Sequence, residues 1–386
     1  MNKVVWQGGK APGPDGLTFP SLSMAQWNSK LRFLGYIIKN QAYQPGPTRP
    51  VEIPKFNGKK RIIQVPNFID KVAARACMEA LSDVCENMFV DWSYGYRPGR
   101  SHVDVLKNIQ KDYQDGCVYI AHYDARDAFD NINVSKLKAL IRELPVNDKV
   151  KSLAEGIVSK GVADDGLGKD FCDMCENTLA LNGGYAVTSQ AELVGKSFGN
   201  IDCITEYYEQ HDISCKQLGI SQGNSLSGLM YNLFLHNFHD KVINSYLNNG
   251  LRIYRYADNF ICVGKEENAV NELASMSMGL LIRVGIQCRC DETVNINNKI
   301  LELLGLTVIA EDNNITFDLT ESSWTRLDQV LDEALTHPSP SKQTTLITNG
   351  WKQSSYPVTW SVRHQERLDD LLSKYGVNAP LPRNED

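Results

Sequence analysis

The chain of 386 residues has no apolar run long enough to span a bilayer, and its first nine residues lack the charged-then-apolar layout of an export signal. It also contains no internal repeat and no low-complexity tract. Its ten cysteines are irregularly spaced, which is typical of reduced thiols in a chain without an export signal. We therefore expect a cytoplasmic protein with no membrane association, rather than a repeat protein or a disulfide-stapled secreted domain.

A basic excess is missing too, since the net charge is −6, whereas nucleic-acid enzymes are usually basic. The charge is unevenly distributed. Residues 1–110 carry 15 Lys and Arg against 8 Asp and Glu, and the remainder carries 25 against 38. This asymmetry predicts that phosphates meet the N-terminal part, while the acidic remainder repels bulk nucleic acid or faces a protein partner. An ordinary solvated surface explains the acidic remainder equally well.

What is present is a globular composition, with 42% hydrophobic and 22% charged residues, enough for two or three subdomains. Both helical and strand periodicities occur, so we predict an α+β fold. Residues 160–215 are poorly periodic and are predicted to be an insertion. Helices are predicted at 21–40, 69–89, 134–143, 147–159, 224–247, 266–285, from 320 onward and at 364–375, and strands at 51–55, 60–65, 118–123, 253–263, 286–290, 301–309 and 314–317.

Two carboxylates lie at the ends of predicted buried strands. Asp258 is at the tip of the 253–263 hairpin, and Asp124 directly follows the strand at 118–123. A carboxylate on such a tip needs a cation, and a divalent metal is the cation that best satisfies it. Either Asp alone is more often structural, but carboxylates from two strands are what two-metal-ion nucleotidyl transfer requires.

Five segments, in this order, resemble those of bacterial reverse transcriptases related to group II intron enzymes. The resemblance implies a right-hand polymerase fold with fingers at 1–115, a palm at 116–315 whose antiparallel sheet carries the catalytic hairpin, and a helical thumb at 316–386. The segments are Gly9–Gly16, Val51–Lys55 with Lys60 and Arg61, Tyr94–Ser101, Gly219–Ser227, and Tyr256–Asn259, whose Tyr-Ala-Asp-Asn is similar to the family's Tyr-x-Asp-Asp.

The resemblance also implies roles for individual residues. The catalytic set is Asp124, Asp258 and Asn259, and two Mg²⁺ ions, or Mn²⁺ in their place, are held by Asp124, Ala125 and Asp258. Phe129 stacks under the deoxyribose and excludes a 2′ hydroxyl, although a core aromatic is the alternative. The remaining dNTP-binding residues are Arg61 with Lys59 or Lys60 at the triphosphate, and Ala125, Gln222, Gly223 and Tyr256.

For the nucleic acid itself, Arg97 and Arg100 are expected to contact template phosphates. For one of the two, a structural capping role is the alternative. Gly305, in Glu302–Leu306, is expected to permit close approach of the primer strand. Near it, Asp291-Glu292-Thr293 stands where relatives carry a Glu-Lys-Thr element, so the proton-donating Lys is absent or shifted to Lys299.

The main departure from the family pattern is Asn259, which replaces the second hairpin Asp. An amide oxygen is a competent but neutral Mg²⁺ ligand, so the site loses one negative charge. Weakened activity or an altered metal preference follows as a hypothesis. A catalytically silent nucleic-acid-binding scaffold paired with an active partner remains the alternative.

The sequence therefore predicts an RNA-directed DNA polymerase that uses dNTPs to make DNA on an RNA template, for which a non-coding RNA is one candidate. By analogy with related enzymes we expect a domesticated bacterial enzyme of antiphage defence, with a protein partner or a homo-oligomer allowed. A non-templated polymerase on the same fold is a further alternative. A side hypothesis is a zinc site from Cys172, Cys175, Cys203, His211 and Cys215, for which buried reduced thiols are the simpler explanation.

Overall fold

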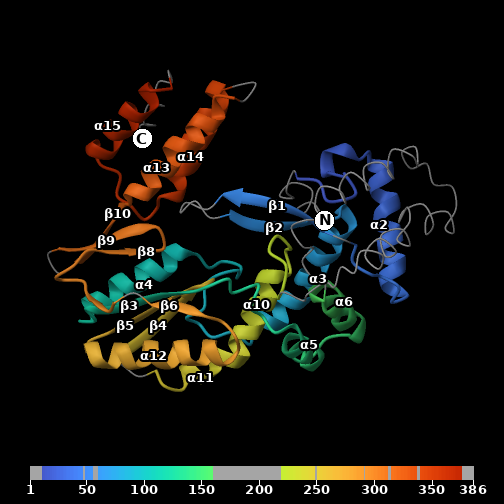
Figure 1. Cartoon of the computed structure of the whole chain (residues 1–386), viewed down its shortest axis with the longest axis horizontal. Helices are drawn as coiled ribbons and strands as arrows, with labels where there is room; N and C mark the ends of the chain where they lie inside the picture. Colours follow the sequence, from blue (N-terminus) through green and yellow to red (C-terminus); the bar gives the residue numbers. More distant parts are fainter. Residues whose placement is uncertain are drawn as a thin grey trace. The chain divides into compact units, whose positions relative to one another are not determined.

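The computed structural model has an α+β fold, as predicted (Figure 1). The insertion at 160–215, with its candidate zinc residues, lies outside the described residues, and so does Lys59. No helix within the described ranges is long and apolar enough to cross a membrane. The structure describes residues 11–46, 48–54, 60–159, 219–247, 250–290, 292–311, 314–336 and 340–375.

The described residues form two compact units, between which the chain passes several times. The first unit is drawn from the ranges Met1–Pro98, Ala125–Tyr246 and Ser277–Cys288. The second is drawn from Gly99–Asp124, Leu247–Met276 and Arg289–Asp386.

The first unit is mainly helical and carries one β-hairpin. Its core lies where α2 packs on α3, and Trp27 meets Phe68 edge to face there, with ring centroids 4.8 Å apart. The predicted hairpin and helices are confirmed, except that the helix predicted at 224–247 consists of three segments in direct succession. The elements are η1 (Phe19–Ser21), α2 (Met24–Lys39), β1 (Thr48–Pro54), β2 (Lys60–Pro66), α3 (Phe68–Glu86), α5 (Val134–Glu143), α6 (Asp148–Val158), α10 (Ser227–Leu235), η2, a π-helix (His236–Asp240), and α11 (Lys241–Asn244).

The N-terminal Gly-Pro-Asp-Gly turn caps α3. The Asp15 carboxylate accepts the backbone N–H of Phe68 at 2.7 Å and that of Leu17 at 3.2 Å, and its own N–H donates to the Asn67 side chain at 3.1 Å. A Cβ on Gly13 would lie 2.4 Å from a carbonyl oxygen at the end of β2. Burial raises the pKa of Asp15, against the opposing effect of its two backbone hydrogen bonds. This motif therefore has a structural role, because it satisfies a helix end that Asn67 leaves uncapped.

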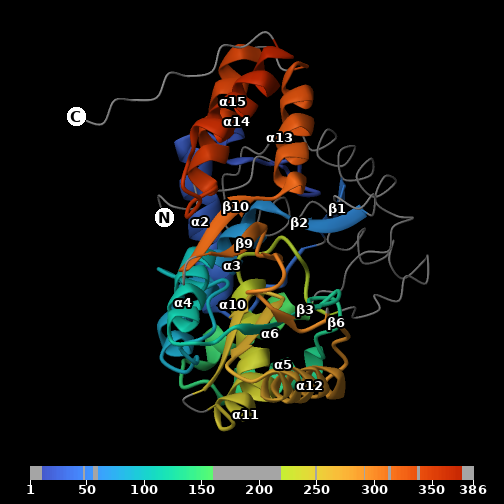
Figure 2. The ribbon, with the colours of Figure 1, turned by 90° about the vertical axis from the view of Figure 1, so that its left-hand side faces the viewer.

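The second unit contains the main antiparallel sheet, whose strand order is β4-β5-β3-β6, with β7 paired to β3. Helix α4, which the sequence did not predict, packs against β4 and β5 and also against β10 of a smaller sheet, so it lies between the two (Figures 1 and 2). The elements are α4 (His102–Gln114), β3 (Tyr119–Ala125), β4 (Leu251–Tyr256), β5 (Asn259–Gly264), α12 (Glu267–Arg283), which belongs partly to each unit, β6 (Cys288–Cys290) and β7 (Val294–Asn295).

The smaller sheet corrects one prediction. The single strand expected at 301–309 is two strands, β8 (Leu301–Leu303) and β9 (Leu306–Glu311), joined by a turn. Leu304 and Gly305 form that turn with φ of 51° and 84°. The glycine is thus explained by the positive φ that the turn requires. β10 (Asn314–Leu319) completes the sheet on the far side of β9.

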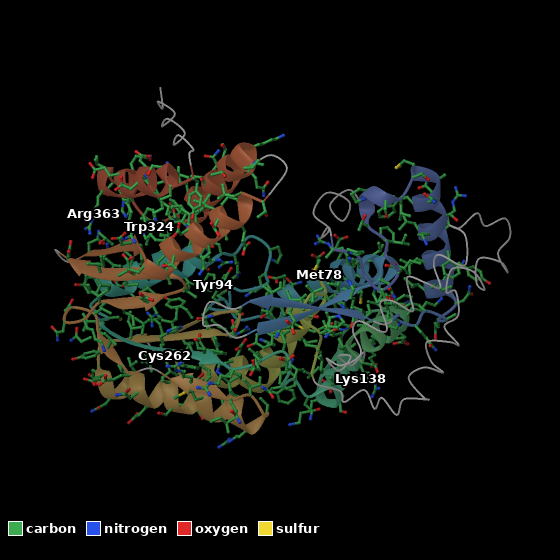
Figure 3. All side chains as sticks on the ribbon, turned by 45° about the horizontal axis from the view of Figure 1, so that its top comes forward. Met78, Tyr94, Lys138, Cys262, Trp324 and Arg363 are labelled. Atoms are coloured by element: carbon green, nitrogen blue, oxygen red, sulfur yellow. The ribbon has the colours of Figure 1, made fainter. Side chains whose placement is uncertain are left out.

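Three helices follow the smaller sheet: α13 (Glu321–Ala334), α14 (Pro340–Ser354) and α15 (Val362–Ser373). Helix α14 was not predicted. Their core is aromatic, since Trp324 meets the Trp351 ring at 4.8 Å and the Trp360 ring at 6.4 Å. Trp324 is labelled among these helices in Figure 3. The Arg367 guanidinium lies over the Trp324 ring at 4.6 Å, a cation–π contact.

Candidate active site

The β4–β5 hairpin places Asp258 and Asn259 at the end of the main sheet. Tyr256 pairs with Asn259 across the turn, and Ala257 adopts φ of 57°. β5 also pairs antiparallel with β3, in a register that sets Asp124 directly opposite Asn259. The predicted strands therefore bring the two predicted sequence motifs to one end of one sheet.

An unpredicted histidine joins this cluster. His122 lies two residues before Asp124 on β3, so both side chains are on the same face of the sheet. Its Nε2 lies 3.0 Å from the Asn259 Oδ1 and 3.6 Å from the Asp124 Oδ1. The Asn259 Nδ2 lies 3.4 Å from the Asp258 Oδ1. The side chain of His122 is 12% exposed and that of Asp124 is 54% exposed, so a carboxylate open to solvent stands beside a mostly buried imidazole.

The donor atoms of the cluster fit a hard divalent cation. Carboxylate, amide and backbone carbonyl oxygens are the ligands that Mg²⁺ prefers, and Mg²⁺ usually keeps several waters. Within the described ranges no group of three or more His, Cys, Asp or Glu side chains is placed to hold a metal. The available carboxylates are thus Asp124 and Asp258, and Ala125 ends the same strand as Asp124.

A cavity of about 880 Å³ lies within the first unit. Three predicted substrate residues, Phe129, Gln222 and Gly223, meet there, and Met78 of α3, labelled in Figure 3, lies on its wall. Its lining is Ile63, Arg75, Met78, Glu79, Ser82, Asp83, Glu86, Tyr96, Arg97, Pro98, Phe129, Gln222, Gly223, Asn224, Ser225, Ser227, Gly228 and Leu229.

Three aromatic rings pack together at this cavity. Phe129 stacks on Tyr231 of α10 with centroids 4.9 Å apart and planes at 21°. Tyr96 meets both rings edge to face, at 5.8 Å from Phe129 and 6.4 Å from Tyr231. Phe129 is 7% exposed and Tyr231 is fully buried, whereas Tyr96 is 50% exposed. The sequence missed Tyr96 and Tyr231, because only the fold brings them to Phe129.

The loop before α10 needs its glycines. The Gln222 carbonyl accepts the Gln64 N–H at 2.8 Å, which ties the loop to β2. Gly223 has φ of 114°, and a Cβ there would lie 2.8 Å from the Gln64 oxygen. Gly219 has φ of 70°, and its Cβ would lie 2.0 Å from the Phe129 oxygen. Neither position has room for a side chain, so only glycine lets the loop approach the β1–β2 hairpin and Phe129 this closely.

The contacts of Arg97 favour the structural alternative, and its contact with template phosphate stays a prediction. Its side chain is 3% exposed, and its Nε donates to the Glu86 carboxylate at 2.8 Å. The Nη1 donates to the backbone carbonyls of Val90 and Ser93 at 2.7 and 2.8 Å. These internal acceptors engage the Nε and Nη1 groups of the guanidinium.

The other predicted residues are spread over the chain. Arg61 pairs with Ile53 in the β1–β2 register, but its side chain and that of Lys60 lie outside the described residues. Arg100 is partly exposed just before α4. The Tyr256 ring meets the His102 ring edge to face at 6.0 Å.

The main sheet thus presents one carboxylate on β3 and one on the β4–β5 turn. Residues 53–173 match the family model described as reverse transcriptase (RNA-dependent DNA polymerase). This likeness covers less than half of the chain.

Two curated proteins are similar to parts of the chain. Protein YkfC of Escherichia coli is 28% identical over 166 residues, which is 42% of this chain and 43% of that protein. The group II intron-encoded protein LtrA of Lactococcus lactis is 34% identical over 125 residues, which is 32% of this chain and 20% of that protein. The match spans less than half the length of either relative. Among solved structures, apo telomerase from Candida tropicalis has a TM-score of 0.43 at 13% identity, covering 91% of this chain and 67% of that one.

Proposed function

We propose that the protein is an RNA-directed DNA polymerase that works by two-metal-ion nucleotidyl transfer, with fingers at 1–115, a palm at 116–315 and a thumb at 316–386. The observation that supports this best is the strand register that sets Asp124 opposite Asn259, next to Asp258. The family match over residues 53–173 supports the same reaction class.

In this proposal Asp124 and Asp258 hold the divalent ions, and Ala125 contributes from the end of β3. Bound Mg²⁺ or Mn²⁺ supplies activation of the primer 3′ hydroxyl and neutralises the leaving pyrophosphate. The 54% exposure of the Asp124 side chain supports its access to ions and substrate. The chain's own part is to fix two carboxylates on paired strands, where the sheet prevents them from moving apart.

Several residues are proposed to bind the dNTP. Phe129 would exclude a ribose 2′ hydroxyl, and Gln222 and Gly223 would line the nucleotide pocket. Their meeting at one cavity supports this assignment. Arg61, with Lys59 or Lys60, would bind the triphosphate through its planar guanidinium. Tyr256 would contact the substrate beside the catalytic hairpin.

For template and primer, Arg100 and Gly305 are proposed contacts, and for Arg97 the internal contacts support a structural role. The proposed partners are an RNA template, for which a non-coding RNA is one candidate, and the DNA product, with a protein partner or a homo-oligomer allowed. We place the protein in the cytoplasm, which is supported by the reduced, buried thiols of Cys77, Cys85 and Cys117. A role in antiphage defence rests on family analogy alone, and a phage challenge of cells carrying Asp124→Asn would test it.

Extension of a DNA primer on an RNA template, with dNTPs and Mg²⁺, tests the enzymatic proposal. Asp124→Asn and Asp258→Asn should each lower kcat/KM roughly 100-fold or more, because each removes a charge that holds the ions. Asp148→Asn on α6 is the matched control, since that carboxylate is 93% exposed and should change the rate less than twofold. Full activity of folded Asp124→Asn would refute the proposal.

A catalytically silent scaffold is the second candidate. It is favoured by Asn259 and by the lack, within the described ranges, of a third carboxylate at the site. Duplex binding without any incorporation by the wild-type chain, under Mg²⁺ and under Mn²⁺, would select it.

A further inference from the structure

The amide of Asn259 is held on both sides. Its oxygen lies 3.0 Å from the His122 Nε2, and its nitrogen lies 3.4 Å from the Asp258 Oδ1. His122 and Asn259 are diagonal neighbours on one face of the β3–β5 pair, since His122 is opposite Ile261 while Asn259 is opposite Asp124. Diagonal neighbours on one face are within reach of long side chains, so the contact follows from the register.

The orientation of the amide is decided by electrostatics. If the amide were flipped, its oxygen would face the carboxylate oxygen of Asp258, and two acceptors would be in contact. In the orientation found, the NH₂ group points at the carboxylate instead. The amide oxygen can only accept, so Nε2 of His122 must carry the proton in this contact.

We propose that Asn259 is a positioning residue rather than a metal ligand, and that His122 is its partner. The imidazole N–H engages the amide oxygen that would otherwise face the cation, and the amide N–H₂ then orients the Asp258 carboxylate. His122 thereby acts on the site through Asn259. This inference rests on the proposed function, because it concerns how the same carboxylates are held.

The proposal changes what restoring the family's second Asp would do. With His122 present, the carboxylate of an Asp at position 259 would accept the hydrogen bond that the imidazole donates. The NH₂ group that orients Asp258 would then be absent. The substitution would also place a carboxylate against a carboxylate. Asn259→Asp alone should therefore fail to strengthen metal binding. Once the imidazole is removed, the new carboxylate becomes free to act as a ligand.

The test is a set of variants read out by calorimetric titration of the nucleic-acid-free protein with Mn²⁺ alone. His122→Leu should weaken Mn²⁺ binding roughly tenfold, because removing a residue that orients a metal ligand typically lowers metal affinity by at least that much. His122→Gln, whose amide can still donate, should stay within about threefold of wild type. Asn259→Asp should bind no more tightly than wild type, and His122→Leu with Asn259→Asp should bind at least about tenfold more tightly than His122→Leu alone.

Unchanged Mn²⁺ affinity in His122→Leu, or tighter binding in Asn259→Asp alone, would overturn the inference. Asp124→Asn separates it from the proposed function. If that variant binds Mn²⁺ like wild type, the metal site itself is wrong, whereas if it loses Mn²⁺ while His122→Leu does not, only the His122–Asn259 pairing is wrong.

A second measurement needs no folded Leu variant. Nitrogen NMR of ¹⁵N-histidine-labelled wild-type protein should give the Nε2–H tautomer for His122, assigned by the signal that disappears in His122→Gln. A resonance with the proton on Nδ1 would overturn the proposed hydrogen bond.

Discussion

Gly228→Ala adds one methyl group at the aromatic cluster and should loosen the sugar selectivity of the proposed polymerase. Gly228 is the second residue of α10, and a Cβ there would lie 2.7 Å from Cγ of Tyr96. Ordinary contact begins near 3.4 Å, so the ring must retreat by roughly 0.7 Å. The added methyl group would also lie 2.9 Å from the Tyr96 Cβ, so the backbone of this 50% exposed residue must shift with its ring and change its contacts with Phe129 and Tyr231.

The expected cost in stability is small. Overpacking costs about 1–3 kcal/mol, and Ala in place of Gly returns up to about 1 kcal/mol of helix propensity. The net destabilisation of roughly 0–2 kcal/mol should lower Tm by only a few degrees in a chain of this size. The variant should therefore fold, and its chemistry can be measured.

Selectivity should change more than stability. An aromatic edge contact contributes about 0.5–1.5 kcal/mol, so weakening the contact of Tyr96 with Phe129 should change the dNTP-to-rNTP ratio of kcat/KM roughly two- to tenfold. Single-nucleotide incorporation of dGTP and GTP on an RNA template measures this ratio. Gly35→Ala on α2 is the matched control, because a Cβ there meets nothing within 4 Å. An unchanged ratio in folded Gly228→Ala, or an equal change in Gly35→Ala, would refute the reasoning.

Three further outcomes are expected. Asp15→Ala should lower the free energy of unfolding by roughly 2–3 kcal/mol in urea titrations, because two backbone N–H groups lose their acceptor, and a loss below about 0.5 kcal/mol would contradict the capping role. Arg97→Lys should cost roughly 1–3 kcal/mol, since one ammonium on a shorter stem cannot reach the acceptors that Nε and Nη1 serve from separate positions, and weaker template binding without a fall in Tm would contradict the structural role. Burial alone would raise the pKa of Asp318, but the His364 hydrogen bond, the Leu319 N–H and nearby Arg363 outweigh it and lower that pKa. The charged carboxylate therefore stabilises the fold at pH values above its ordinary pKa of 3.8, and this stability is lost as the pH falls through the lowered pKa of the folded state. The Tm of Asp318→Asn should therefore depend less on pH than the Tm of wild type below about pH 4. An equal dependence on pH would contradict this.

Strands and helices with clear periodicity were predictable, and the two missed helices show why others were not. Residues 94–101 resemble a family motif, and that resemblance does not indicate a helix. The helix signal is instead the capping box of Ser101 and Asp104, which marks the start of α4. Helix α14 begins at Pro340, and the two prolines at 338 and 340 are typical of a break between helices. Proline is well suited to the first position of a helix, so the same residue that ends one helical pattern starts the next.

At the candidate site, the sequence identifies the residues that carry the charge, but it does not identify the neighbouring residues that orient those charged side chains. Asp124 and Asp258 were predictable, because each ends a strand and each lies in a recognisable motif. His122 is invisible to that reasoning until the β3–β5 register is known, since the register alone decides which side chain faces Asn259. Tyr231 likewise looks like one more apolar residue of α10 until the fold stacks it on Phe129.

The position of Asn259 shows what this difference means for function. From sequence, the amide is a weaker ligand in a place where relatives have a carboxylate, and its expected effect is a loss. In the structure, the same amide accepts from one neighbour and donates to another, which a carboxylate cannot do. The missing carboxylate at position 259 and the imidazole of His122 are therefore two parts of one arrangement. Substituting only one of these two residues breaks that arrangement, so both must be changed together to test a site with a second Asp.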